Sequence, residues 1–186
     1  MKKIKYLSLT FVSLFSLQSC NIYKQNTVNY EEYLTHCDND ETFFLSLYGT
    51  SCHACESALK DVTSYFKNNE EVPVYFMDAQ TLFQTGNESQ RENIYNTVVS
   101  TYTKNEANYR YRYFTSEISE VTSENFKNYF PSLVTPTNIL FKDGEAVSVR
   151  FGYYNLAKDA TPENQTLEEN GVAETLDNML KQAGLK

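Results

Sequence analysis

The sequence predicts an α/β fold in which a mixed four-stranded sheet carries helices on both faces. Residues 42–77 contain an apolar strand, an amphipathic helix and a second apolar strand, which together form a βαβ unit with parallel strands. Asp143-Gly144 is a hairpin turn between two further apolar segments, which predicts an antiparallel pair. A helical pattern over residues 166–182 then closes the domain.

The composition fits one domain preceded by a short leader. The chain has 186 residues, of which 41% are hydrophobic and 15% aromatic, and this is enough for one core. The net charge of -8 argues against nucleic-acid binding, which needs clustered Lys and Arg. The cysteines are too few for a disulfide framework in a chain of this length: Cys20, Cys37, Cys52 and Cys55.

Residues 1–19 have the organisation of a signal peptide. A basic start precedes an apolar run that is shorter than the roughly 20 residues of a transmembrane helix. The run ends in Leu-Gln-Ser-Cys20, which resembles the lipobox of bacterial lipoproteins. The resemblance implies a lipid on Cys20, a flexible tether over residues 20–29, and a domain over 30–186 outside the cell, anchored to the bacterial membrane. An ordinary cleaved signal peptide and an uncleaved anchor are the alternatives.

The first half of the domain should contain the βαβ unit. A short helix is expected over residues 28–36, and a turn follows it. Thr42–Tyr48 is a continuous apolar run, which is typical of a strand buried on both faces. From Cys52 the apolar residues recur at helical spacing, up to a break at Pro73. The second strand is expected over residues 72–77.

Residues 79–130 should form a mainly helical insertion. Apolar residues at helical spacing predict a helix over Glu88–Lys104, and residues 108–114 could be a strand or a helix end. Ser123 is a good N-cap for a short helix that reaches Phe130. The insertion could be a lid or a partner surface, or it could only cover the core.

The last elements surround the hairpin turn. Asn138–Lys142 and Glu145–Tyr153 should pair as antiparallel strands. A loop is expected over residues 155–164. The closing helix should span Thr166–Gln182, with Leu167 on its buried side.

Cys52 and Cys55 form a Cys-x-x-Cys motif that opens the helix after the buried strand. A helix N-terminus carries unpaired N–H groups and a partial positive charge, which lower the pKa of a thiol placed there. Cys52 should therefore be the exposed nucleophile, and Cys55 should resolve the mixed disulfide. His53 could add positive charge or a hydrogen bond to the thiolate. Half of a zinc site, a permanent structural disulfide and a chance motif are the alternatives.

These motifs resemble the thioredoxin superfamily over roughly residues 42–78 and 131–183. The strand, the Cys-His-Ala-Cys sequence and the helix are similar to the active site of that family, and Val134–Glu145 to its second signature. The resemblance implies a thioredoxin-like fold, with a cis Pro136 beside the cysteines and a Thr135 backbone that pairs with an extended substrate. It also implies thiol–disulfide exchange that needs no cofactor and no metal.

Four positions differ from the reductant members of the family. Ser51 stands where they have Trp, His53-Ala54 replaces Gly-Pro, and Ser46 replaces a buried acidic residue. These differences argue against a housekeeping thioredoxin. A narrower likeness is to the thioredoxin-like accessory proteins that assist disulfide formation in secreted bacteriocins, although no motif here is specific to them.

The sequence therefore predicts an extracytoplasmic thiol–disulfide oxidoreductase. Its expected partners are exported cysteine-containing proteins, a redox partner protein and the membrane, and the direction of electron flow stays open. The alternative is a binding or accessory lipoprotein with a thioredoxin fold and a structural or vestigial disulfide. Cys37 should be a buried structural thiol at the end of the sheet opposite the redox site. It could pair with Cys20 if that residue carries no lipid.

Overall fold

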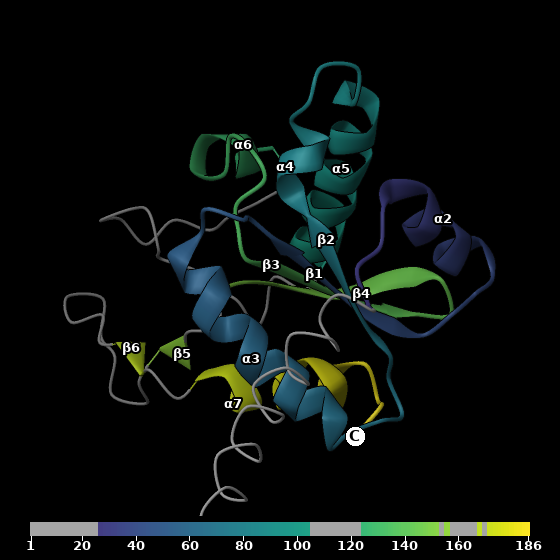
Figure 1. The fold of residues 1–186 in the computed structure, drawn as a ribbon, viewed down its shortest axis with the longest axis vertical. Helices are drawn as coiled ribbons and strands as arrows, with labels where there is room; N and C mark the ends of the chain where they lie inside the picture. Colours follow the sequence, from purple (N-terminus) through teal and green to yellow (C-terminus); the bar gives the residue numbers. More distant parts are fainter. Residues whose placement is uncertain (1–25, 105–123, 153–154, 157–166, 169–170) are drawn as a thin grey trace, which may run out of the picture.

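A mixed four-stranded sheet forms the centre of the computed structural model, which describes residues 26–104, 124–152, 155–156, 167–168 and 171–186. The strands lie in the order β2-β1-β3-β4 (Figure 1). β1 and β2 are parallel, and β3 is antiparallel to β1 and to β4. Their bounds are β1 Phe43–Tyr48, β2 Val74–Asp78, β3 Thr137–Lys142 and β4 Glu145–Phe151. The predicted α/β fold class, with its βαβ unit and its hairpin, is confirmed.

Helices cover both faces of this sheet, as expected. α3 and α7 lie on one face, and α2 and α5 lie on the other (Figure 1). In the insertion between β2 and β3, the shorter helices α4 and α6 precede and follow α5 in sequence, and both lie on the same side of it in Figure 1. The bounds are α2 Tyr30–Asp38, α3 His53–Lys67, α4 Ala79–Leu82, α5 Glu88–Lys104, α6 Phe126–Tyr129 and α7 Gly171–Gln182.

β1 divides the core into two halves. All six of its residues are buried, because helices cover the sheet on both sides. Phe43, Leu45 and Leu47 pack in the half beneath α2 and α5. Phe44 and Tyr48 pack in the half beneath α3 and α7. The side chains of β1 alternate between the two halves because successive residues of a strand point to opposite faces of the sheet. The end of β1 therefore lies between the two halves of the core.

The N-terminal boundary of the domain differs from the expectation. A flexible tether was expected to reach residue 29, but Thr27 forms a parallel bridge with Phe76 of β2. The Asn26 side chain also donates to the Val74 carbonyl at 2.9 Å. Residues 26–28 therefore extend the edge of the sheet. Their polar composition had suggested a tether, but backbone pairing with an edge strand does not depend on apolar side chains.

The C-terminal part also differs from the expectation. Leu167 was expected on the buried side of the closing helix, but it lies in the strand β6 (Leu167–Glu168). β6 pairs with β5 (Asn155–Leu156), where a loop was expected, and α7 begins only at Gly171. A pairing between residues so far apart in sequence leaves no periodic signal, and the apolar Leu167 fits a helix pattern equally well.

The short helix before β3 is smaller than expected. α6 is a single turn, Phe126–Tyr129, and its N-cap residue Asn125 makes no side-chain capping hydrogen bond. Ser123 and the expected element over residues 108–114 lie outside the described residues. In the described part of the chain, no helix is both long and apolar enough to span a membrane. The expected lipidation residue Cys20 also lies outside that part.

The β3–β4 turn lies against the end of α2. Gly144 has φ +73°, and a Cβ at this position would overlap the carbonyl oxygen of Cys37. Only glycine combines this backbone conformation with so close an approach. Since β3 runs away from Pro136 toward this turn, Cys37 lies at the end of the sheet opposite that proline, as the sequence predicted.

Candidate redox site

The buried strand β1 delivers the first cysteine to the start of α3. After β1 the chain turns at Gly49, whose carbonyl accepts a hydrogen bond from the Cys52 amide at 3.0 Å. Cys52 is the N-cap of α3, with extended backbone angles of φ -91° and ψ 105°. Cys55 lies one helical turn on, and the two cysteines form a disulfide. The predicted redox pair therefore lies where the sequence placed it.

The two sulfurs differ in their access to solvent. Cys55 is only 1% exposed and packs in the core half beneath α3, whereas Cys52 is half-buried. The Cys55 backbone amide donates to Cys52 Sγ at 3.2 Å. In the reduced protein the same amide can stabilise a thiolate on Cys52, because an N–H group that faces an anion makes a charge-assisted hydrogen bond. This geometry is consistent with the expected roles of Cys52 as the attacking thiol and Cys55 as the resolving thiol, which stay predictions.

The second motif lies beside this disulfide. The Thr135–Pro136 peptide bond is cis, and Pro136 is buried. Because β3 pairs with β1, the chain just before β3 lies against the end of β1. The Thr135 carbonyl oxygen lies 3.6 Å from Cys52 Sγ. The expected cis isomer and its place beside the cysteines are both present, while the roles of Thr135 and Pro136 toward a substrate stay predictions.

Gly49 allows the two segments to approach closely. A Cβ at this position would lie 3.3 Å from Thr135 Oγ1 and 3.4 Å from the Cys52 Cβ. Both distances are at the tight limit for a side-chain contact. Glycine at this position therefore sets the spacing between the loop of residues 49–52, here called the cysteine loop, and the segment that contains Thr135.

Ser46 is completely buried on the sheet face that α3 covers. It lies opposite Asn138 of β3, which is also completely buried. Every fully buried polar residue in the described part of the chain is neutral: Ser46, Thr101, Thr137, Asn138, Ser148 and Thr175. In that part, no buried carboxylate lies near the pair to accept a proton from Cys55.

His53 and Ala54 form the first turn of α3 between the two cysteines. Their proposed tuning of the redox pair stays a prediction, because it depends on side chains whose positions are not described. A zinc site was the metal alternative. Within the described segments, no group of three or more His, Cys, Asp and Glu side chains is arranged to hold a metal ion.

Cys37 is a free, half-buried thiol that is remote from the disulfide. Burial raises the pKa of its thiol, and a hydrogen bond with Tyr33 opposes that shift more weakly. A raised pKa leaves less of the nucleophilic thiolate at neutral pH. Its position at the opposite end of the sheet and the raised pKa of its thiol both argue against a redox role for Cys37, which stays a prediction.

Nothing in the sequence indicated that Gln80 contacts the loop that precedes Cys52. Thr50 Oγ1 donates to Gln80 Oε1 at 2.6 Å, and Gln80 Nε2 donates to Ser51 Oγ at 3.2 Å. Gln80 belongs to α4, the first helix of the insertion. The available signal was the parallel pairing of β1 and β2, which places the residues that follow each strand side by side.

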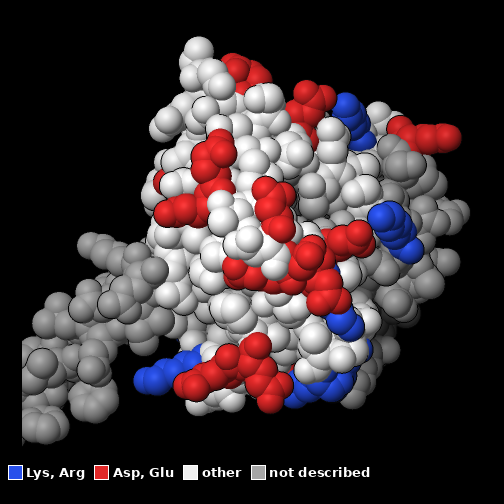
Figure 2. Space-filling model, turned by 90° about the vertical axis from the view of Figure 1, so that its right-hand side faces the viewer, with Lys and Arg blue, Asp and Glu red and all other residues white. Residues whose placement is uncertain are grey.

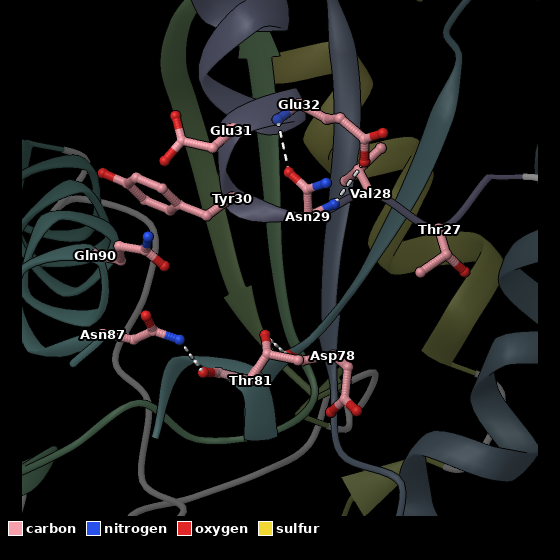
Figure 3. A pocket seen from close by; sticks show the side chains of 10 residues that line it. All are labelled: Thr27, Val28, Asn29, Tyr30, Glu31, Glu32, Asp78, Thr81, Asn87 and Gln90. Carbon is pink, nitrogen blue, oxygen red and sulfur yellow. Dashed lines mark hydrogen bonds between the residues drawn. The ribbon is translucent and has the colours of Figure 1, made fainter. Parts of the chain in front are cut away.

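A separate cavity of about 550 Å³ lies between the start of α2, α4 and the start of α5 (Figure 3). Asn29 and Glu32 line it and form the capping box of α2, and Asn87 reaches across to the Thr81 carbonyl. Acidic side chains also gather on the face of the molecule that carries α2 (Figure 2). No cysteine lines this cavity, so it is distinct from the disulfide.

The sheet order, the disulfide at the start of α3 and the cis-proline beside it define the class of protein. The chain is an α/β protein of thioredoxin-like topology with a Cys-x-x-Cys pair, which is consistent with a redox function. This assignment rests on the topology and on the place of the two motifs within it.

No family model and no curated protein matches the sequence. Among solved structures, the chain is similar to thioredoxin f2 of Chlamydomonas reinhardtii, at 9% identity and a TM-score of 0.48, over 86% of this chain and 96% of that one. It is also similar to a protein described as a candidate oxidoreductase with a thioredoxin fold. That match has 9% identity and a TM-score of 0.46, over 84% of this chain and 96% of the other.

Proposed function

We propose that this protein is an extracytoplasmic thiol–disulfide oxidoreductase that acts on the disulfides of exported proteins. The observation that carries the proposal is the asymmetry of the pair. Cys52 is half-buried at a helix N-cap, and Cys55 is 1% exposed directly behind it. A purely structural disulfide has no need of one accessible sulfur at a position that stabilises a thiolate.

The exchange proceeds in two steps that balance in electrons and protons. The Cys52 thiolate attacks one sulfur of a substrate disulfide, forms a mixed disulfide and releases the other substrate sulfur as a thiolate, which takes up a proton. The Cys55 thiol loses its proton to solvent and attacks Cys52 Sγ, which releases the second substrate thiolate. Two electrons pass to the substrate, and the enzyme keeps the Cys52–Cys55 disulfide. The reverse sequence oxidises a substrate dithiol.

The Thr135 segment supplies a place for the substrate backbone. Its carbonyl oxygen faces Cys52 Sγ at 3.6 Å, so an extended substrate that pairs with this segment brings its own cysteine to the same sulfur. In the reduced protein the Cys52 thiol can donate to this carbonyl. A substrate backbone that pairs with the Thr135 segment therefore lies directly beside the Cys52 sulfur.

The proposed location follows from the leader rather than from the domain. A lipid on Cys20 would tether the domain to the outer face of the membrane through the segment that ends at Asn26, where pairing with β2 begins. Exported polypeptides gain their disulfides in this compartment. A tethered oxidoreductase would therefore meet its substrates as they emerge.

Trapping of the mixed disulfide tests the proposed function. In Cys55→Ala, the resolving thiol is absent, so intermediates between Cys52 and substrates should accumulate in cells that are quenched with acid and alkylated. The matched control is the double variant Cys52→Ala/Cys55→Ala, which should trap nothing, with Cys37→Ala added to both to exclude that thiol. If Cys55→Ala forms no adduct that dithiothreitol releases, the pair is not catalytic and the protein is a binding module with a structural disulfide.

A further inference from the structure

The loop that carries Cys52 lies beside the first helix of the insertion. β1 and β2 are parallel, with Tyr48 opposite Asp78 at the last pair of the register. The residues that follow the two strands therefore leave the same edge of the sheet. After β1 the chain forms the cysteine loop, and after β2 it forms α4.

α4 is fixed to the domain independently of the loop. Ala79 and Leu82 are 2% and 1% exposed and anchor the helix in the core half beneath α5. Asp78 Oδ1 accepts the Gln80 amide at 2.9 Å, and the Thr81 hydroxyl donates to the Asp78 carbonyl at 2.7 Å. Gln80 therefore projects from a rigid base, although it is itself exposed to solvent.

The Gln80 side chain uses both ends of its amide on the loop. Its oxygen accepts from Thr50 Oγ1 at 2.6 Å, and its nitrogen donates to Ser51 Oγ at 3.2 Å. Thr50 and Ser51 directly precede Cys52, and both are exposed. One side chain thus holds two consecutive residues at the point where the chain enters α3.

We propose that Gln80 is a positioning residue for the redox pair, which it serves by fixing the loop that holds Cys52 at the N-cap of α3. It touches neither sulfur and acts through Thr50 and Ser51. The inference rests on the proposed function, since it concerns the reactivity of the same thiol. It also gives the start of the insertion a role in the redox site.

Gln80 affects the Cys52 thiol by restraining the conformation of the loop that carries it. Cys52 Sγ faces the Cys55 amide only while the loop keeps the N-cap conformation of Cys52. Exposed loop residues without side-chain restraints gain conformational freedom, and the time that the sulfur spends at the helix start falls. The thiolate loses part of its stabilisation, so the pKa of the Cys52 thiol rises and its attack on a disulfide slows.

The test compares the pKa of the Cys52 thiol in reduced wild type, Gln80→Ala and Gln84→Ala. Gln84 is an exposed glutamine just beyond α4, and it serves as the matched control. The rate of alkylation by iodoacetamide is followed against pH, with the Cys52 peptide identified by mass spectrometry. We expect Gln80→Ala to raise the pKa by about half a unit and to slow alkylation about threefold below the pKa. Gln84→Ala should match the wild type.

A second set of variants shows whether Gln80 acts through the loop. Thr50→Val and Ser51→Ala each remove one of its partners. The double variant Thr50→Val/Ser51→Ala should reproduce the pKa of Gln80→Ala, and addition of Gln80→Ala to it should change nothing further. Additive shifts would overturn the proposal.

The outcomes separate this inference from the proposed function. If Gln80→Ala lowers the melting temperature but leaves the pKa of the Cys52 thiol unchanged, Gln80 is only structural and the proposal is wrong. If the wild type exchanges no thiols with substrates and Gln80→Ala still shifts the pKa, the proposed function fails and the positioning role stands.

Discussion

Gly49 shows how narrowly the geometry of the redox site depends on single residues. We predict that Gly49→Ala destabilises the protein by about 1 kcal/mol and slows exchange at Cys52, because the new methyl group must displace its neighbours by a few tenths of an ångström. The nearest of these neighbours is Thr135 Oγ1, at 3.3 Å from the added Cβ. Urea unfolding and the rate of insulin reduction measure the two effects.

Thr135→Ala provides the control for this prediction. It removes Oγ1 and leaves the Cys52 Cβ as the nearest contact, at 3.4 Å. The double variant Gly49→Ala/Thr135→Ala should therefore be less impaired than the sum of the two single variants. Additive losses would mean that Gly49 does not set the spacing between these segments.

The sequence located the residues of the candidate site better than the side chains that hold them in place. Cys52, Cys55, Thr135 and Pro136 carry motifs that are recognisable by local order, and the structure brings them together. Gln80 carries no motif. Its role depends on which strands are neighbours and on the direction of one side chain, and neither is encoded in local periodicity.

At the scale of elements, a polar cluster joins the C-terminal end of the chain to α3 and α7. Asp177 of α7 accepts from the Tyr65 hydroxyl of α3, and Lys186 Nζ lies 2.6 Å from the same carboxylate oxygen. The hydrogen bond from Lys186 and then that from Tyr65 lower the pKa of Asp177. Both charged side chains are partly exposed, so the cluster stabilises the fold modestly.

We expect this cluster to make the free energy of unfolding depend on pH in the acid range. Because the folded pKa of Asp177 is lower than its unfolded value, its contribution is present above the ordinary aspartate range and is lost as the pH falls through the folded pKa. Asp177→Asn should therefore be less stable than wild type at pH 7, and the difference should shrink near pH 3. Urea unfolding at both pH values measures this, with Asp61→Asn on the exposed side of α3 as control. A difference that is independent of pH would contradict the assignment.

The elements differ in how far the sequence could define them. The helix Glu88–Lys104 was predicted with both bounds correct, because its apolar residues recur at helical spacing over several turns. The single turn α6 was predicted as a longer helix, and Leu167 was placed in a helix rather than in β6. A short element contains few periods of the hydrophobic pattern. Its secondary structure is therefore set by its tertiary contacts rather than by its local sequence.

In the whole molecule, the predicted lipid anchor in the leader and the redox pair in the domain are independent of one another. Residues 26–28, the first of the described residues, pair along β2, and the polar composition of this segment gave no sign of this pairing. If Cys20 carries a lipid, the domain is held close to a membrane by the few residues between Cys20 and this pairing.

Cys20→Ala tests the anchor by cell fractionation. We expect this variant to leave the membrane fraction and to appear in the periplasm or the medium, because a lipid chain is what holds a soluble domain at a membrane surface. Cys37→Ala, which changes a thiol within the folded domain, should stay with the membrane. If Cys20→Ala remains bound to the membrane, the lipobox assignment is wrong, whereas the redox site is unaffected.

The proposed function requires that the Cys52–Cys55 disulfide opens and closes reversibly in exchange with other thiols. The direct measurement is an equilibrium titration of the purified protein against glutathione buffers, in which alkylation and mass spectrometry count the thiols of this pair. We expect a two-electron couple between about -120 and -270 mV, the range of dedicated oxidoreductases. A pair that stays oxidised at potentials below about -300 mV would be a structural disulfide, and the protein would not be an oxidoreductase.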